Sequence, residues 1–119
     1  MTSSSARVTA SELLAQLPGQ VTTQWPEGAR SIVGLQHGTM SVKLFAPRGI
    51  DRQMPHTQDE VYFVIAGSGT FDLDGNRHPF EPGTAFFVPA GVIHRFEDFT
   101  PDFVTWVVFW GPEGGERTE

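Results

Sequence analysis

The sequence contains no cysteine, has little positive charge and lacks any long hydrophobic run. Without cysteine the chain can form neither disulfides nor the thiolate sites of zinc fingers and iron–sulfur clusters, and it has no thiol nucleophile. Only 8 Lys and Arg oppose 14 Asp and Glu, which gives a formal net charge of −6. We therefore expect no nucleic-acid partner, because such proteins normally carry a basic stripe, and no membrane partner, because no basic amphipathic helix is present.

No apolar stretch approaches the ~18 residues that a membrane-spanning helix requires. Near the N-terminus, the apolar residues between Leu13 and Leu17 are too few for the core of a signal peptide, and no basic leader precedes them. These features predict a soluble protein of the cytoplasm.

Turn-forming residues are plentiful, with 13 Gly and 9 Pro among 119 residues. This composition favours many short elements joined by turns over a few long helices. One short helix is predicted within residues 9–17, capped by Thr9 or Ser11 and stopped by Pro18-Gly19. Apolar residues make up 39% of the chain and include 10 Phe, so the chain can build a real core.

Beyond residue 20 the pattern is that of short strands spaced roughly 8–12 residues apart, which is typical of an all-β sandwich or barrel. The predicted strands are 21–25, 31–35, 40–46, 60–66, 70–73, 78–80, 84–88, 92–96 and 103–110. We divide the chain into a lead-in with the short helix (1–19), a β-barrel (20–112) and a flexible tail (113–119).

Several predicted strands are apolar on both faces. Along residues 60–66 both alternating sets of side chains are apolar, apart from Glu60 at the start. A small sheet structure has one inside and one outside, so the outside must be covered by the N-terminal segment, a second sheet or a second subunit. We expect a homodimer.

Two of the four histidines stand in segments that favour a metal site. His56 precedes the predicted strand 60–66, and the even offset to Glu60 places both side chains on one face of an extended chain. A carboxylate at the mouth of an apolar interior is costly unless it is compensated, and a metal ion with imidazole and carboxylate ligands would compensate it. The alternative is that Glu60 is a solvated charge at the end of a strand. His94 follows the turn Pro89-Ala90-Gly91, which would present it at the rim of a sheet.

The segment around Glu60 resembles the first signature motif of the cupin family. That motif has a His-x-His pair, then three or four residues, a Glu, six residues and a Gly. His56 matches the second histidine, Glu60 the glutamate and Gly67 the glycine, with the six-residue gap kept. Met54 stands where the first histidine is expected, and its thioether is a poor ligand for a hard or borderline metal.

The segment before His94 resembles the second cupin motif, which has a Gly, five residues, Pro-x-Gly, two residues and a His. Gly83, Pro89, Gly91 and His94 match it with every gap kept. Asp98 stands where this motif often ends in Asn. The resemblance implies an all-β fold, a double-stranded β-helix or jelly-roll barrel with one short N-terminal helix, and a metal inside its mouth.

The ligand set that the resemblance leaves is His56, Glu60 and His94. Two histidines and one carboxylate can hold non-haem iron with open positions, and can also hold manganese, zinc or nickel. A glutamine oxygen could fill the position that Met54 leaves. Gln58 shares parity with His56 and Glu60 and is the preferred candidate; Gln53, or water, is the alternative.

Four aromatic residues are candidate walls of the substrate pocket, and they are Tyr62, Phe96, Trp106 and Phe45. His37 and His78 belong to no motif and are left out of the site. The leading hypothesis is a small metal-binding cupin that acts on a small organic molecule, with dioxygenase-, isomerase- or lyase-like chemistry. The alternatives are a non-catalytic module that binds or senses a small ligand, and a metal-free, epimerase-like enzyme with a histidine base.

Overall fold

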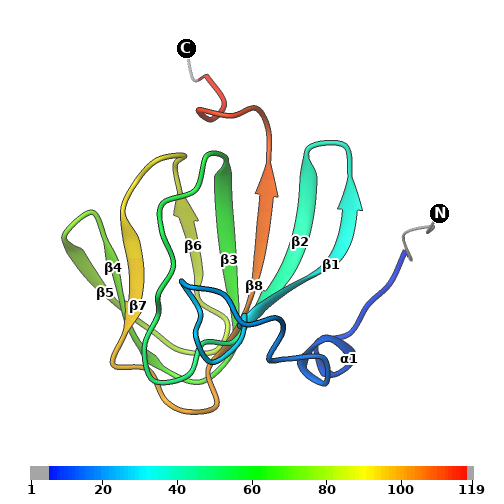
Figure 1. Ribbon diagram of the computed structural model, residues 1–119. Coiled ribbons are helices and arrows are strands. Elements are labelled where there is room, and N and C mark those ends of the chain that lie inside the picture. Colours follow the sequence, from blue (N-terminus) through cyan, green and yellow to red (C-terminus); the bar gives the residue numbers. More distant parts are fainter. Residues whose placement is uncertain (1–5, 118–119) are drawn as a thin grey trace.

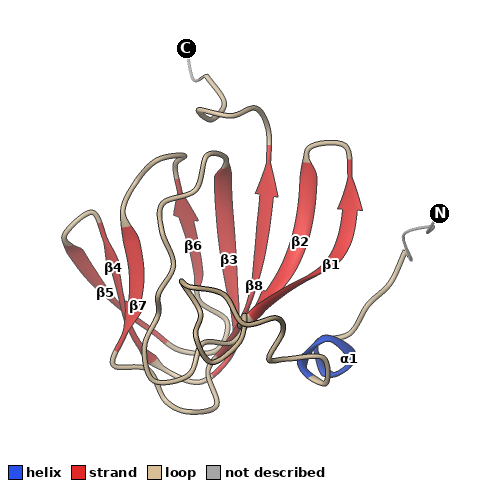
Figure 2. Ribbon diagram, in the orientation of Figure 1, coloured by secondary structure: helices blue, strands red, loops and turns tan. Residues whose placement is uncertain are grey.

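The computed structural model describes residues 6–117, which form one short helix and eight strands (Figures 1 and 2). The elements are α1 (Ala10–Leu14), β1 (Ser31–His37), β2 (Met40–Phe45), β3 (Asp59–Ala66), β4 (Gly69–Leu73), β5 (Asn76–Phe80), β6 (Ala85–Val88), β7 (His94–Glu97) and β8 (Val104–Trp110). Parts of the predicted lead-in and tail, residues 1–5 and 118–119, lie outside the described residues.

The strands form two antiparallel sheets, in the orders β1-β2-β8-β3-β6 and β5-β4-β7. Strands far apart in sequence are neighbours in these sheets. For example, β8 lies between β2 and β3, and β7 pairs with β4. Figure 1 shows the two sheets facing each other, with the long segment from β2 to β3 crossing between them. The all-β jelly-roll fold with one short N-terminal helix is thus confirmed.

One predicted strand, 21–25, is not formed. Instead, the Thr22 N–H donates to the carbonyl of Trp25, and the Trp25 N–H donates to the hydroxyl of Thr22. These local bonds fold the segment into a turn, because a Thr hydroxyl offers the backbone an alternative to a sheet ladder. The turn matters for the site, since it brings Trp25 over the interior of the large sheet, edge-on to Phe45.

The helix is capped by Thr9, one of the two predicted caps: its side chain accepts from the Glu12 N–H while the Glu12 carboxylate accepts from the Thr9 N–H. This reciprocal pair satisfies two backbone donors that a helix end would otherwise leave free. The helix directs Leu13 against Leu44 and Val104 on the outer face of the large sheet, where all three are buried. The N-terminal segment therefore covers part of that face.

The core lies between the two sheets and is dominated by aromatic rings. Its fully buried members include Tyr62, Phe71, Phe96 and Phe103. Phe96 is central, with ring centroids 5.0 Å from Tyr62, 4.5 Å from Phe71 and 4.7 Å from Phe103. Interlocked rings hold the inner faces of the sheets at a fixed separation.

The outer face of the large sheet is apolar beyond the region that the N-terminal segment covers. Phe63, Ile65 and Phe87 are 48%, 36% and 52% exposed there. Within residues 6–117, no helix is long and apolar enough to cross a membrane.

The start of the predicted tail is held against the motif segments. The Gly114 N–H donates to the carbonyl of Thr57, and the Glu116 N–H donates to the carboxylate of Asp59. The chain that follows β8 therefore lies beside the segment that carries His56.

Candidate metal centre

The two motif segments are joined by backbone and side-chain hydrogen bonds. The Gly91 N–H donates to the carbonyl of His56 over 2.7 Å, and the Ala90 N–H donates to the carboxylate of Asp59 over 3.0 Å. Gly91 has φ of +80°, a conformation that glycine adopts without steric cost. The Pro-x-Gly turn thus fixes His94, at the start of β7, relative to His56, just before β3.

The three residues predicted as metal ligands converge on one point. Nδ1 of His56 lies 2.8 Å from Oε2 of Glu60, and Nε2 of His94 lies 3.4 Å from Oε1. One ligand atom from each of the three residues lies within 4.8 Å of the others. Glu60 and His94 are buried, whereas the His56 side chain is 33% exposed, so the group faces solvent on the His56 side.

The charges of this group are strongly coupled. Burial alone would raise the pKa of Glu60, but the hydrogen bond from His56 and the contact with His94 outweigh it and lower the pKa to about 2. For His94, burial opposes the charged form, yet the nearby Glu60 carboxylate reverses this effect and raises the pKa above its ordinary value. Glu60 is therefore ionised at neutral pH, and its negative charge is buried.

Glu60 retains an unused acceptor. Although Nε2 of His94 is within ion-pair distance, no hydrogen bond to Oε1 is formed, and this oxygen is buried without a hydrogen-bond partner among residues 6–117. An orphaned buried oxygen is costly unless something else binds it. Two imidazoles and a carboxylate are a suitable donor set for a divalent transition metal, so these residues fit the ion that the motifs imply.

The missing first histidine is not replaced by Met54, which is 61% exposed. Gln58 also lies in another place: its amide nitrogen donates to the carbonyls of Thr39 and Gly111, over 3.0 and 2.9 Å. Gln58 would share the face of Glu60 only in an extended chain, but β3 begins only at Asp59. Gln58 thus links loops, and its prediction as a ligand is not supported.

Gln53, the alternative, lies one hydrogen bond away from the group. Its Oε1 accepts from the Tyr62 hydroxyl over 2.9 Å, and that hydroxyl lies 3.1 Å from Nε2 of His94. Behind Gln53, the buried carboxylate of Asp51 accepts from the Gln53 backbone and side-chain N–H groups and from the Phe96 N–H. Burial raises the pKa of Asp51 although these three donors oppose the shift. Sequence reasoning missed Asp51, which belongs to no motif.

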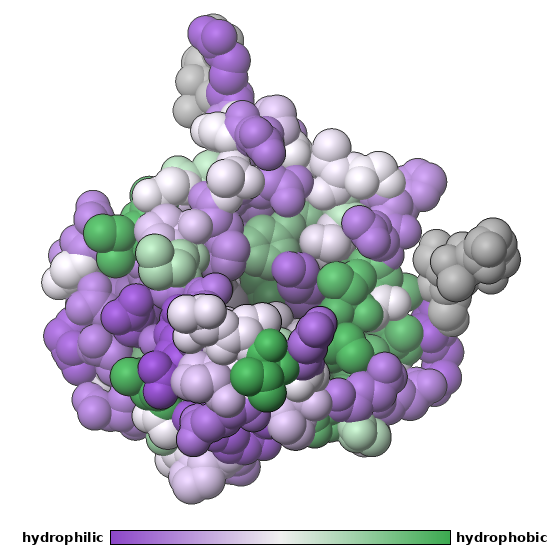
Figure 3. Space-filling view, in the orientation of Figure 1, coloured by the Kyte–Doolittle hydropathy of each residue, from purple (hydrophilic) through white to green (hydrophobic). Residues whose placement is uncertain are grey.

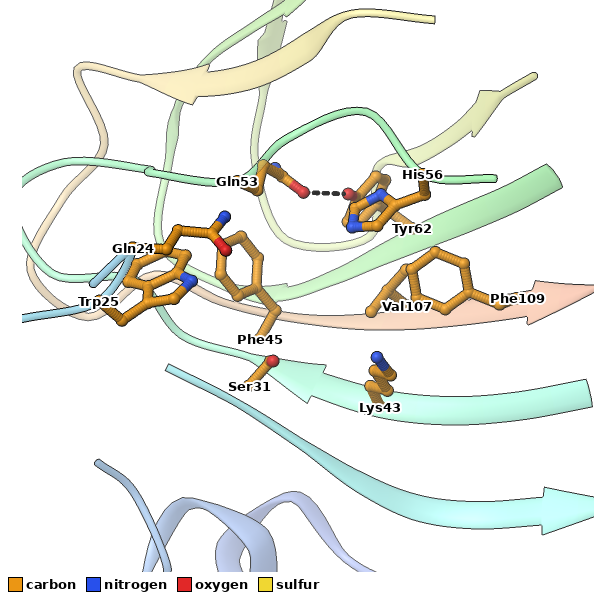
Figure 4. A pocket seen from close by; sticks show the side chains of 10 residues that line it. All are labelled: Gln24, Trp25, Ser31, Lys43, Phe45, Gln53, His56, Tyr62, Val107 and Phe109. Carbon is orange, nitrogen blue, oxygen red and sulfur yellow. Dashed lines mark hydrogen bonds between the residues drawn. The ribbon is translucent and has the colours of Figure 1, made fainter. Parts of the chain in front are cut away.

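A cavity of about 190 Å³ opens beside the group, on the inner face of the large sheet (Figure 4). It is lined by Gln24, Trp25, Ser31, Lys43, Phe45, Gln53, His56, Tyr62, Val107 and Phe109. Figure 3 shows this side of the molecule hollowed near its centre, with apolar atoms inside and hydrophilic side chains around them.

Of the four predicted pocket walls, Tyr62 and Phe45 line the cavity and two do not. Phe96 is completely buried behind Tyr62 in the aromatic core. Trp106 pairs with Leu44 across β2 and β8 and therefore points to the outer face, where it packs near the N-terminal helix. His37 and His78 are exposed on β1 and β5 and stand apart from the three-residue group, as expected.

Comparison with known proteins gives consistent matches. The family model of the cupin domain matches residues 41–110. An uncharacterized protein of Streptomyces coelicolor is 40% identical over 81 residues, which cover 66% of this chain and 77% of that protein. Acireductone dioxygenase 1 of Pectobacterium atrosepticum is 40% identical over 65 residues, which cover 50% of this chain but only 37% of the dioxygenase.

Among solved structures, KdgF from a Halomonas species superimposes with a TM-score of 0.60. The match covers 70% of this chain and 80% of that one, at 19% sequence identity. At this identity the likeness concerns the fold alone.

Proposed function

This chain belongs to the cupin domain family, and from that premise we propose that it binds one divalent transition metal through His56, Glu60 and His94 and acts on a small organic molecule there. The observation that carries the proposal is the buried Oε1 of Glu60, which has no hydrogen-bond partner within residues 6–117. It lies 3.4 Å from Nε2 of His94, while His56 contacts the other oxygen of the same carboxylate. A cation at this point would offset the cost of the buried charge.

The side chains are arranged to present ligand atoms in defined states. Nδ1 of His94 donates to the carbonyl of Val92 over 2.8 Å, so the proton of the neutral imidazole is on Nδ1 and Nε2 has a free lone pair. The ring of His56 packs edge-on against Phe109, with centroids 4.9 Å apart, which restricts its rotation. Tyr62 places its hydroxyl beside Nε2 of His94 and separates the group from the aromatic core.

When bound, a metal of this kind polarises a substrate oxygen as a Lewis acid or, if it is iron, supports oxygen chemistry. We propose Fe, Mn, Zn or Ni as the ion, with dioxygenase-, isomerase- or lyase-like chemistry. The similarity to acireductone dioxygenase 1, which covers 50% of this chain, supports chemistry of the dioxygenase type. In each case His56, Glu60 and His94 hold the ion, while Tyr62 and Phe45 bound the space that the substrate occupies.

The experiment is metal reconstitution followed by elemental analysis and equilibrium dialysis. The wild-type chain should retain one equivalent of metal, and His94→Ala should lose it. The matched control is His78→Ala, which removes an exposed histidine of β5 and should leave binding unchanged. Circular dichroism reports whether His94→Ala is folded, and His56→Ala gives a second, more exposed ligand deletion. A full equivalent of metal in folded His94→Ala would exclude the proposed site.

Two other functions are supported by particular observations. The exposed Met54 at the position of a family ligand favours a module that binds or senses a small molecule without turnover. The 2.8 Å contact between His56 and Glu60 would suit a metal-free, epimerase-like enzyme in which Glu60 orients a histidine base. Metal analysis of the purified protein distinguishes the metal-free enzyme from the two functions that need a metal. Oxygen consumption or substrate loss with iron restored separates catalysis from binding.

We also propose that the chain forms a homodimer through the uncovered part of the outer sheet face. Phe63, Ile65 and Phe87 are exposed there on neighbouring strands, β3 and β6. Contiguous apolar surface of this kind is typical of interaction sites. Sedimentation equilibrium should give twice the mass of one chain for the wild-type protein, and the mass of one chain for Phe63→Asp.

A further inference from the structure

Lys43 extends into the cavity beside the metal centre. In β2 it pairs with Val107 of β8 and shares the inner face of the sheet with Phe45, because side chains two residues apart on a strand point the same way. Figure 4 shows Lys43 rising from β2 into the space that His56, Val107 and Phe109 bound. An ammonium group therefore lies on the interior side of a sheet whose other inner residues are largely apolar.

The ammonium of Lys43 is not paired with any carboxylate that the structure describes. Among residues 6–117, no Asp or Glu lies within ion-pair distance of Lys43. The cavity lining includes no acidic residue, and Lys43 is its one Lys or Arg. The ammonium lies over the face of the Phe109 ring, 5.0 Å from its centroid. A half-buried cation that faces a cavity without a counter-charge favours an anion in that cavity.

Phe109 also links Lys43 to the metal centre. The same ring packs against His56, with centroids 4.9 Å apart. The ammonium and the imidazole thus contact one side chain, so a small molecule in the cavity can reach both. The cavity volume of about 190 Å³ is smaller than the roughly 300–1,000 Å³ of pockets for drug-sized ligands, which restricts the occupant to a small metabolite.

The rest of the lining suits a short carbon skeleton. Trp25, Phe45 and Val107 supply apolar surface. Beyond Trp25, a second cavity of about 210 Å³ is lined by Arg30, Arg48 and Arg52 together with one acidic residue, Glu27, so its lining carries a net positive charge. This end of the molecule therefore gathers positive charge although the whole chain carries −6, and such a local field attracts anions toward the opening.

We propose that the cavity takes a small organic acid, whose carboxylate pairs with the Lys43 ammonium while a second oxygen of the same molecule reaches the centre formed by His56, Glu60 and His94. The inference rests on the proposed function, because that centre is its second anchor. It adds a substrate class, and it assigns to Lys43 the selection of anions over neutral molecules of the same shape.

The test uses the full chain loaded with Co²⁺, whose visible absorption changes when a ligand enters the cavity. Acetate, pyruvate and lactate are titrated beside their neutral amides, acetamide, pyruvamide and lactamide. A charge-assisted contact corresponds to about tenfold in affinity, so at least one acid should bind about tenfold more tightly than its amide. Lys43→Met, which keeps the length of the side chain, should abolish this preference, and Lys43→Arg should keep it.

The matched charge control is Arg77→Met, which removes one positive charge from β5, where Arg77 pairs with Glu97 and Asp98. It should leave the preference for acids unchanged. If Co²⁺ binds but acids and amides perturb the spectrum equally, or if Lys43→Met keeps the preference, the inference is wrong while the metal site stands. If the wild-type chain binds no Co²⁺, the proposed function fails and the inference fails with it. Comparing variants at equal acid concentration removes the effect of free acid on cobalt in solution.

Discussion

The hydroxyl of Tyr62 lies 3.1 Å from Nε2 of His94, but its proton is directed away from that histidine. The amide of Gln53 is oriented by Asp51, because Nε2 of Gln53 donates to the Asp51 carboxylate and leaves Oε1 for Tyr62. A carbonyl oxygen can only accept, so the hydroxyl donates to Gln53. Tyr62 therefore presents its oxygen lone pairs to the metal centre and accepts a hydrogen bond from His94 only when Nε2 is protonated.

Gln53→Leu should destabilise the fold, because it leaves both the Tyr62 hydroxyl and the Asp51 carboxylate buried with a partner missing. Each unsatisfied buried group costs about 1–3 kcal/mol, so we expect the two groups to lower the free energy of unfolding by about 2–6 kcal/mol. Gln16→Leu, at an exposed position after α1, is the control and should change stability by less than about 0.5 kcal/mol. Urea denaturation measures both. Equal losses in the two variants would contradict the orienting role of Gln53.

Metal affinity should increase as the pH rises through the raised pKa of His94. The metal and the proton compete for Nε2, since Nδ1 is engaged by the Val92 carbonyl. Below that pKa, each pH unit should weaken binding up to about tenfold. Competition titrations with a chromophoric chelator at several pH values measure the slope. A flat profile between about pH 5 and 7 would show that His94 is not a ligand.

In the metal-free chain, the pair formed by Glu60 and His94 should contribute most to stability between pH 4.5 and 6.5. The pKa of Glu60 is lowered from 4.5 to about 2, so its contribution is present above 4.5 and is lost as the pH falls toward 2. The pKa of His94 is raised from 6.5, so its contribution is present below 6.5 and is lost as the pH rises through the raised value. Urea denaturation across this range should show the maximum, and Glu60→Gln should flatten it.

Gly67, the glycine of the first motif, lies close to another backbone segment, and Gly75 is a control with a similar backbone conformation but free space around it. Both have positive φ, +87° and +88°. A Cβ on Gly67 would lie 2.5 Å from Cα of Phe103, whereas a Cβ on Gly75 would meet nothing within 4 Å. Gly75→Ala should cost about 1–2 kcal/mol for its backbone conformation, and Gly67→Ala about 1–3 kcal/mol more for the overlap. Thermal denaturation tests the order, and equal costs would rule out the close approach.

The sequence was informative where spacing within one segment determines geometry. Glu60 and Tyr62 share the inner face of β3, as their alternation predicts, and the two motifs bring His56 and His94 to Glu60. Lys43 could have been found by the same reasoning, because it has the parity of Phe45, which was predicted as a pocket wall.

Other features depend on contacts between distant segments, which spacing alone does not determine. Asp51 and Gln53 act through Phe96 and Tyr62, and the irregular segment before β3 gives them no periodic pattern. The parity of Gln58 with Glu60 does not place Gln58 at the site, because this segment is not extended and Gln58 bonds to Thr39 and Gly111 instead. Trp106 was misplaced because the inner face of β8 is set by its pairing with β2 and β3, and an apolar strand does not reveal which face is inner.

The bond between the Gly91 N–H and the His56 carbonyl has a consequence for how an ion would be bound and released. It joins the two segments that carry the imidazoles through the backbone, independently of any ion. The ligands are therefore preorganised, and little chain entropy remains to be lost on binding. Unlike a zinc finger, whose folding depends on its metal, this scaffold should survive treatment with a chelator and be ready for exchange of one ion for another.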